Sequence, residues 1–127
     1  MTIRQAQLAA FGNVARMSFE QRLQNHLTAR YPRVGERFGA KRVNELIALG
    51  IDRARKYGFK VEADVANYCD LMFRFGPEFD RGVRSSWARP HLNNRNEAGS
   101  LRMQRILVAA QQNRQFEINP PSERNMA

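Results

Sequence analysis

A dense apolar stretch with a helix-ending signal directly behind it constrains the fold of this chain most strongly. Residues 68–75 read YCDLMFRF, and a Gly-Pro pair follows. Apolar side chains nearly all round a helix indicate packing on several sides, and glycine followed by proline is typical of a helix C-terminus. Glu62 and Asp64 suit the first turn of the same helix, where the helix dipole favours carboxylates. We therefore predict a central, buried helix over residues 62–75.

Three other stretches show the apolar spacing of three or four residues that is typical of amphipathic helices. These stretches are residues 3–30, 40–57 and 97–113. Thr2 and Gln5 have the spacing of a capping box at the start of the first one. Pro32 follows its end closely and predicts a stop there. The stretch 32–39, which reads PRVGERFG, is predicted to be a connector because two glycines and a proline are typical of loops.

The pattern predicts an all-α fold, because the chain shows neither sustained alternation nor a hairpin signal. We expect four to five helices around one core. Residues 76–96 are predicted to be irregular, with a short helix over 83–89 that contains Trp87 and that Pro90 ends. The helical domain is expected to cover residues 1–115.

Residues 116–127 have little apolar surface to bury, and they include Pro120 and Pro121. We expect this C-terminal tail to be mobile, as chain termini without packing usually are.

The length of 127 residues suits one domain that can build its own core. No apolar run is long enough for a membrane span or for a secretory signal. The single cysteine leaves no internal disulfide, which favours a reducing compartment. The expected location is therefore the cytoplasm.

The net charge of +9 is unevenly distributed, because residues 61–80 are net acidic and both flanks are basic. A basic excess indicates an acidic partner, namely nucleic acid, anionic lipid or an acidic protein. Arginine far outnumbers lysine, and arginine favours bidentate contacts with carboxylate or phosphate. The alternative is that the arginine excess reflects only a high-GC genome.

No metal or cofactor site is predicted. A zinc site needs about four cysteine or histidine ligands, and the candidates Cys69, His26 and His91 lie far apart in the sequence. Cys69 lies on the apolar face of its helix, where a thiol is usually an inert core residue. A phosphate-binding glycine-rich loop is also missing from the sequence.

Three acidic residues, Asp70, Glu78 and Asp80, are the candidates for a catalytic group. General acid–base catalysis requires a cleft and shifted pKa values, neither of which a sequence shows. A structural role is the preferred interpretation, in which Asp80 pairs with an arginine nearby in the sequence. The candidate arginines are Arg81, Arg84 and Arg89. We therefore expect no catalytic residues and no enzymatic activity.

Basic residues cluster around the predicted connector. They are Arg30, Arg33, Arg37, Lys41 and Arg42. Tyr31 and Phe38 lie between them, and basic residues with interspersed aromatics can bind phosphates and stack on bases. The alternative is that both rings fill the gap between two helices. The long connector lacks the tight turn of a helix-turn-helix motif.

The segment 57–80, YGFKVEADVANYCDLMFRFGPEFD, together with Trp87-Ala88, resembles a family of small, mostly uncharacterised all-α bacterial proteins. These proteins are encoded beside type VI secretion spike genes (VgrG and PAAR tip proteins) and their toxins. The stretches IRQAQLAAF and FEQRLQNHL are similar in character, so the resemblance covers most of residues 2–110. The sequence departs from the family pattern before Trp87, where GVRSS replaces a segment that is often rich in proline.

The resemblance implies a non-catalytic accessory protein, an adaptor or chaperone that binds a type VI toxin or spike component. Aromatic and arginine anchors dominate protein interfaces, so the expected partner contacts are Phe79, Arg81, Arg84, Trp87 and Arg89. The alternative is that the two aromatic residues only cover the core. Two other functions remain open, namely an immunity protein that blocks a toxin and a small basic nucleic-acid-binding protein.

Overall fold

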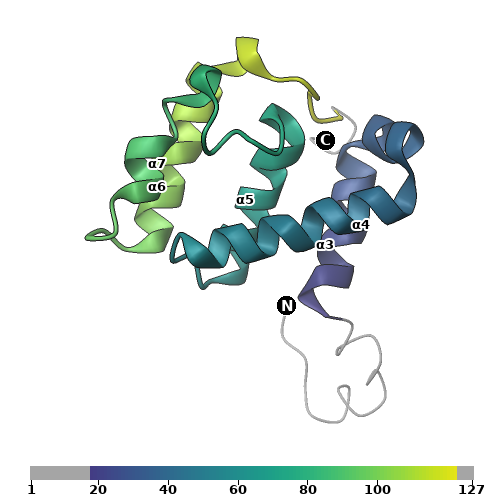
Figure 1. Ribbon diagram of the computed structural model, residues 1–127, viewed down its shortest axis with the longest axis horizontal. Coiled ribbons are helices and arrows are strands. Elements are labelled where there is room, and N and C mark those ends of the chain that lie inside the picture. The colour runs from purple at the N-terminus through teal and green to yellow at the C-terminus, as the bar shows by residue number, and fades with distance from the viewer. Residues whose placement is uncertain (1–17, 123–127) are drawn as a thin grey trace.

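The computed structural model describes residues 18–122. Within that range the chain forms five α-helices and two short 3-10 helices and contains no strand, which confirms the predicted all-α class. Figure 1 shows α5 in the middle, with α3 on one side and α6 and α7 on the other, while α4 runs across the molecule beside α5. The helices are α3 (Phe19–Arg30), α4 (Pro32–Lys56), α5 (Glu62–Phe75), α6 (Arg89–Asn93) and α7 (Gly99–Gln112).

Helix α3 begins with a side-chain cap that the sequence analysis did not identify. The Ser18 hydroxyl accepts a hydrogen bond from the backbone N–H of Gln21 at 3.1 Å, and Ser-x-x-Gln is the spacing of a capping box. The helix confirms the second half of the predicted stretch 3–30. The predicted start of that stretch, with Thr2 and Gln5, lies outside the described residues.

The predicted connector at residues 32–39 is wrong, because α4 begins directly at Pro32. Proline fits the first turn of a helix, where its missing N–H costs no hydrogen bond and its fixed φ is already helical. Only Tyr31 separates α3 from α4. The break in α4 occurs at Gly39, whose φ of 82° and ψ of 163° are non-helical. Glycine adopts such a φ without the steric cost of a Cβ.

The part of α4 after Gly39 and the whole of α5 confirm the helices predicted at 40–57 and 62–75. Helix α5 ends at Gly76, which has a φ of 106° and donates its N–H to the Met72 carbonyl at 2.9 Å. Helices α4 and α5 are in close contact at Gly50, where a Cβ would lie 2.7 Å from the Cys69 sulfur. The missing side chain at this position therefore allows the two helices to pack together.

The segment between α5 and α7 contains a 3-10 turn, η1 (Val83–Ser85), and the short helix α6. The predicted helix over 83–89 is wrong in its extent, and Pro90 does not end a helix. Instead, Pro90 lies in the first turn of α6, the position that proline tolerates. Helix α7 agrees with the prediction of 97–113 to within two residues at each end.

The chain after α7 returns across the molecule toward α3 (yellow in Figure 1). It forms a second 3-10 turn, η2 (Arg114–Phe116). Beyond it, the N–H of Ile118 donates to the Arg74 carbonyl at 2.8 Å, and the N–H of Ser122 donates to the Arg30 carbonyl at 2.8 Å. The first part of the tail that we expected to be mobile is therefore hydrogen-bonded to two helices, and residues 123–127 lie outside the described part.

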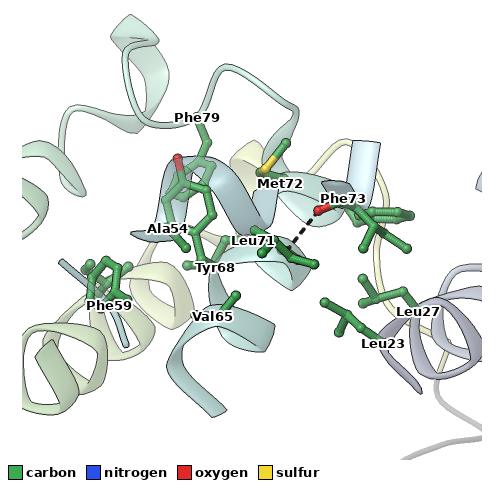
Figure 2. Packing of buried hydrophobic residues seen from close by; sticks show 14 of the residues in the cluster. Leu23, Leu27, Ala54, Phe59, Val65, Tyr68, Leu71, Met72, Phe73 and Phe79 are labelled. Carbon is green, nitrogen blue, oxygen red and sulfur yellow. Dashed lines mark hydrogen bonds between the residues drawn. The ribbon is translucent and has the colours of Figure 1, made fainter. Parts of the chain in front are cut away.

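The core is centred on α5 (Figure 2). Tyr68 lies against Phe79 with ring centroids 5.0 Å apart, and Leu23 and Leu27 of α3 cover the opposite side near Phe73. No helix within residues 18–122 combines the length and the hydropathy that crossing a membrane requires. The other large buried side chains include Ile47, Phe59, Val65, Leu71, Leu92, Met103 and Ile106.

Candidate partner-binding surface

Asp70 is held in a buried polar cluster. Its Oδ1 accepts hydrogen bonds from Arg30 Nε and from the Tyr31 hydroxyl, both at 2.8 Å. Its Oδ2 lies 3.4 Å from a terminal nitrogen of Arg74. Burial, followed by the negative charge of Asp70, raises the pKa of Tyr31 to about 12. Tyr31 is thus buried, and Arg30, whose side chain is 22% exposed, is paired with Asp70 and separated from the other cations of the predicted basic patch.

A cavity of about 300 Å³ lies beside this cluster, and His26 contributes to its wall. Arg30 and Arg74 also line it, but both already face Asp70, and Arg74 Nε lies 3.4 Å from Glu117. The positive and negative charges at this cavity are therefore matched within the protein.

Asp80 and Glu78 belong to a second, separate network. The Tyr57 hydroxyl donates to Asp80 Oδ2 at 2.7 Å, and Arg81 lies 3.4 Å from the same oxygen, which confirms the predicted pairing of Asp80 with Arg81. Glu78 pairs with Arg53 at 3.5 Å and with Arg81 at 3.2 Å.

Asp70 shares no partner with Asp80 or Glu78 among the contacts described above. The structure therefore does not bring the three carboxylates considered as a catalytic group into one network.

Phe79 does not fit its predicted role as a partner contact, because its side chain is 1% exposed. It fills the core beside Tyr68, as the alternative interpretation had it. Trp87 is half-buried and packs edge-on against Phe75 with centroids 5.0 Å apart. Its indole N–H is buried without a hydrogen-bond partner among the described residues. Both aromatic residues therefore serve mainly to cover the core.

The three arginines predicted around Trp87 differ in their surroundings. Arg81 is exposed but paired with two carboxylates, and Arg89 donates to the Gly82 carbonyl at 3.3 Å. Arg84 is exposed. Among the five predicted contact residues, Arg84 is therefore the one that is exposed and whose side chain has no hydrogen-bond or ion-pair partner within residues 18–122.

Arg102 is a buried arginine that sequence reasoning missed. Its side chain is enclosed, with 2% of the residue exposed. It donates to the carbonyls of Leu92 at 2.8 Å and Tyr57 at 2.7 Å, and it lies over the Phe59 ring at 4.6 Å from the centroid. Burial lowers the pKa of Arg102, and the positive charge of Arg95 lowers it further. Arg102 therefore ties α7 to the end of α4.

The remaining residues of the predicted basic patch stay exposed on the first half of α4. They are Arg33, Arg37, Lys41 and Arg42, and together with Phe38 we call them the α4 basic face. Arg42 lies 4.0 Å from Glu45, whereas the other three have no ion-pair partner among residues 18–122. Phe38 is 51% exposed, and the Arg37 guanidinium lies 5.3 Å from the centroid of its ring.

A groove separates the start of α4 from the returning tail. It consists of two adjoining cavities of about 380 Å³ and about 460 Å³, both lined by Arg33, Val34, Ile118 and Asn119. We call this feature the α4–tail groove. Ile118 is 60% exposed. The sequence does not indicate this wall, because the tail is held beside α4 by tertiary hydrogen bonds to Phe73 and Arg74 of α5 and to Arg30 of α3.

The described part of the chain contains no group of three or more His, Cys, Asp or Glu side chains that could hold a metal ion. Cys69 is fully buried, and burial raises the pKa of its thiol to about 12. The thiol is therefore protonated at neutral pH, which does not suit a nucleophile.

Comparison of the chain with protein-family models, with curated proteins and with solved structures found no significant match.

Proposed function

We propose that this protein is a non-catalytic accessory protein, an adaptor or chaperone, that binds a toxin or spike component of a type VI secretion system. The observation that supports binding most directly is the α4 basic face. Three cations there, Arg33, Arg37 and Lys41, are exposed and lack ion-pair partners within residues 18–122. Such a surface accelerates encounter with an acidic partner and selects against basic ones.

The type VI assignment rests on the resemblance of residues 57–80, and the structure gives those residues a physical role. Tyr57 bonds to Asp80, and Tyr68 packs on Phe79. Asp64 accepts a hydrogen bond from Ser100 at 2.9 Å, which joins α5 to α7. The residues behind the resemblance thus build the core. The partner surface is better sought on α4, away from that motif.

The adaptor role and the immunity role predict different results in cells. Deletion of the gene tests an adaptor, because toxin delivery into neighbouring cells should fall while the producing cell survives its own toxin. An immunity protein gives the opposite result, in which delivery continues and cells without the protein are poisoned. Unchanged delivery together with unchanged survival contradicts both roles.

The same face also favours nucleic acid as a second candidate, since exposed cations surround a half-exposed phenylalanine ring. This candidate predicts affinity for an oligonucleotide that falls by orders of magnitude between about 50 and about 200 mM salt. Binding that stays unchanged over that range would exclude it. Tyr31, the other aromatic residue of the predicted patch, is buried and bonded to Asp70, which weakens a stacking role.

A further inference from the structure

We infer that the α4–tail groove binds an acidic peptide segment of the partner, with one large apolar side chain of that segment inserted between Phe38 and Ile118. The inference rests on the proposed function and extends it, because it specifies where the partner binds and what chemistry its segment has.

The walls of the groove supply the apolar part of this site. Phe38 on α4 and Ile118 on the tail are exposed by 51% and 60%, respectively. Both line the same cavity, and the adjoining cavity has Val34 and Pro121 in its wall. A partner that covers apolar side chains this exposed removes much apolar surface from water, which contributes favourable binding free energy.

The rim of the groove supplies the charge complementarity. Arg33 and Arg37 lie four residues apart and therefore on one side of the short helix before Gly39. Both line the groove, where Glu36 is the single acidic residue among those the structure describes. Lys41 and Arg42 continue the positive charge beyond the bend. The surplus of positive charge at the rim matches an acidic segment and opposes a basic one.

The same contacts favour a peptide over a nucleic acid. Stacking of a base needs a free aromatic face, and the Arg37 guanidinium lies over the Phe38 ring at 5.3 Å. The opposite wall contains the aliphatic side chains of Ile118, Pro120 and Pro121 beside the polar Asn119 and Ser122. It offers no aromatic ring on which a base could stack, whereas its aliphatic part suits an apolar side chain of a peptide.

The groove is already formed in the free chain. The bend at Gly39 sets the direction of the first part of α4, and the tail is held by Asn119, which donates through Nδ2 to the Phe73 carbonyl at 2.9 Å. A preformed site loses less conformational entropy when it binds. A short linear segment can therefore bind it without rearrangement of the domain.

The test uses the full chain, labelled with ¹⁵N, and two synthetic peptides. One is acidic with a single central leucine, and the other has serine in place of that leucine. The leucine peptide should shift the amide signals of residues 33–38 and 117–119, and the serine peptide should bind about tenfold more weakly. Signal changes elsewhere, no change at all, or equal binding of both peptides would overturn the inference.

Variants separate the apolar wall from the charged rim. Phe38→Ser and the double variant Arg33→Glu/Arg37→Glu should each weaken binding of the leucine peptide by about tenfold or more. The matched control is Arg55→Glu/Lys60→Glu, which makes the same change in net charge at two exposed cations outside the groove. An equal loss of affinity for the leucine peptide in the control variant would mean that only the net charge of the protein matters, which would contradict a localised site.

An oligodeoxythymidine probe decides between the two classes of macromolecule. The inference predicts that it binds more weakly than the leucine peptide at about 150 mM salt. Tighter binding of the oligonucleotide at the same amides would overturn the peptide assignment. The proposed function can fail separately. If the groove binds the peptide but deletion of the gene alters neither toxin delivery nor survival, the binding site is supported and the secretion role is contradicted.

Discussion

Arg30 and Asp70, forty residues apart in the sequence, form a hydrogen bond of 2.8 Å between Nε and Oδ1 that joins the end of α3 to α5. The backbone carbonyl of the same Arg30 accepts the N–H of Ser122. One residue thus connects the core carboxylate to the tail that forms a wall of the α4–tail groove. The stability of the fold and the shape of the proposed binding site are coupled at this point.

Asp70→Asn should lower the free energy of unfolding by about 2–4 kcal/mol, because it removes the buried charge that compensates Arg30 and Arg74. Urea unfolding followed by circular dichroism measures the effect. Glu45→Gln is the control, since it disrupts an exposed pair with Arg42 and should cost less than about 0.5 kcal/mol. Equal effects of the two substitutions would contradict the role assigned to the buried cluster.

Gly50→Ala should destabilise the protein by about 1–2 kcal/mol despite the better helix propensity of alanine. The new Cβ would lie 2.7 Å from the Cys69 sulfur and 2.9 Å from the Met72 sulfur. Adding Cys69→Ala to Gly50→Ala should recover part of the loss, which a double-mutant cycle measures as coupling.

Gly35→Ala is the control for this prediction. No atom of residues 18–122 lies within 4 Å of the Cβ position at Gly35, so the substitution should stabilise α4 by up to about 1 kcal/mol. Stabilisation by both alanines would show that α4 and α5 are not in close contact at Gly50.

Arg102→Lys should cost about 2–3 kcal/mol of stability, because an ammonium group cannot reach both the Leu92 and the Tyr57 carbonyls in the geometry of a guanidinium. Arg105→Lys on the same helix is the matched control. Arg105 is about half exposed and pairs with Glu97 at 2.8 Å. Arg105→Lys should therefore change the free energy of unfolding by less than about 0.5 kcal/mol. Thermal unfolding of both variants makes the comparison.

The protein should lose stability as the pH rises from 10 toward 12. Burial is the largest cause that raises the pKa of Tyr31 and of Tyr57 from 10.0 to about 12, and it raises the pKa of Cys69 from 9.0 to about 12. In this window the unfolded chain releases protons that the folded chain still holds, so the free energy of unfolding falls with pH.

Urea titrations between pH 9 and 12 measure this dependence, and Tyr31→Phe should make it shallower. A free energy of unfolding that does not change with pH over this range would contradict the buried environment of the Tyr31 hydroxyl. So would a free energy that falls as steeply with pH in the Tyr31→Phe variant.

The helices α5 and α7 could be predicted from the sequence because their signals are local. The apolar spacing of each is unbroken, and Gly76 and Pro77 end α5 within the sequence itself. The helical start of α4 could not be predicted in the same way. Proline is compatible with a helix stop and with a first turn, and the sequence does not reveal that Gly39 rather than Gly35 takes the positive φ.

The candidate surface was predictable only in part. Arg33 and Arg37 were recognised from their clustering and are exposed, whereas Arg30 turns inward because Asp70 lies opposite it on another helix. Phe79 was predicted as an anchor and is buried, because only tertiary packing places it against Tyr68. Ile118 was missed, since nothing in the tail itself indicates that it pairs with the end of α5.

Affinity purification tests the central claim most directly. The tagged protein and its Arg33→Glu/Arg37→Glu variant would be recovered from nuclease-treated lysates of their native cells, washed at moderate salt and analysed by mass spectrometry. The account predicts a type VI spike or toxin protein in stoichiometric amount with the unaltered chain and its loss with the variant. Recovery of no such protein, or binding that disappears only because nuclease was added, would contradict the account.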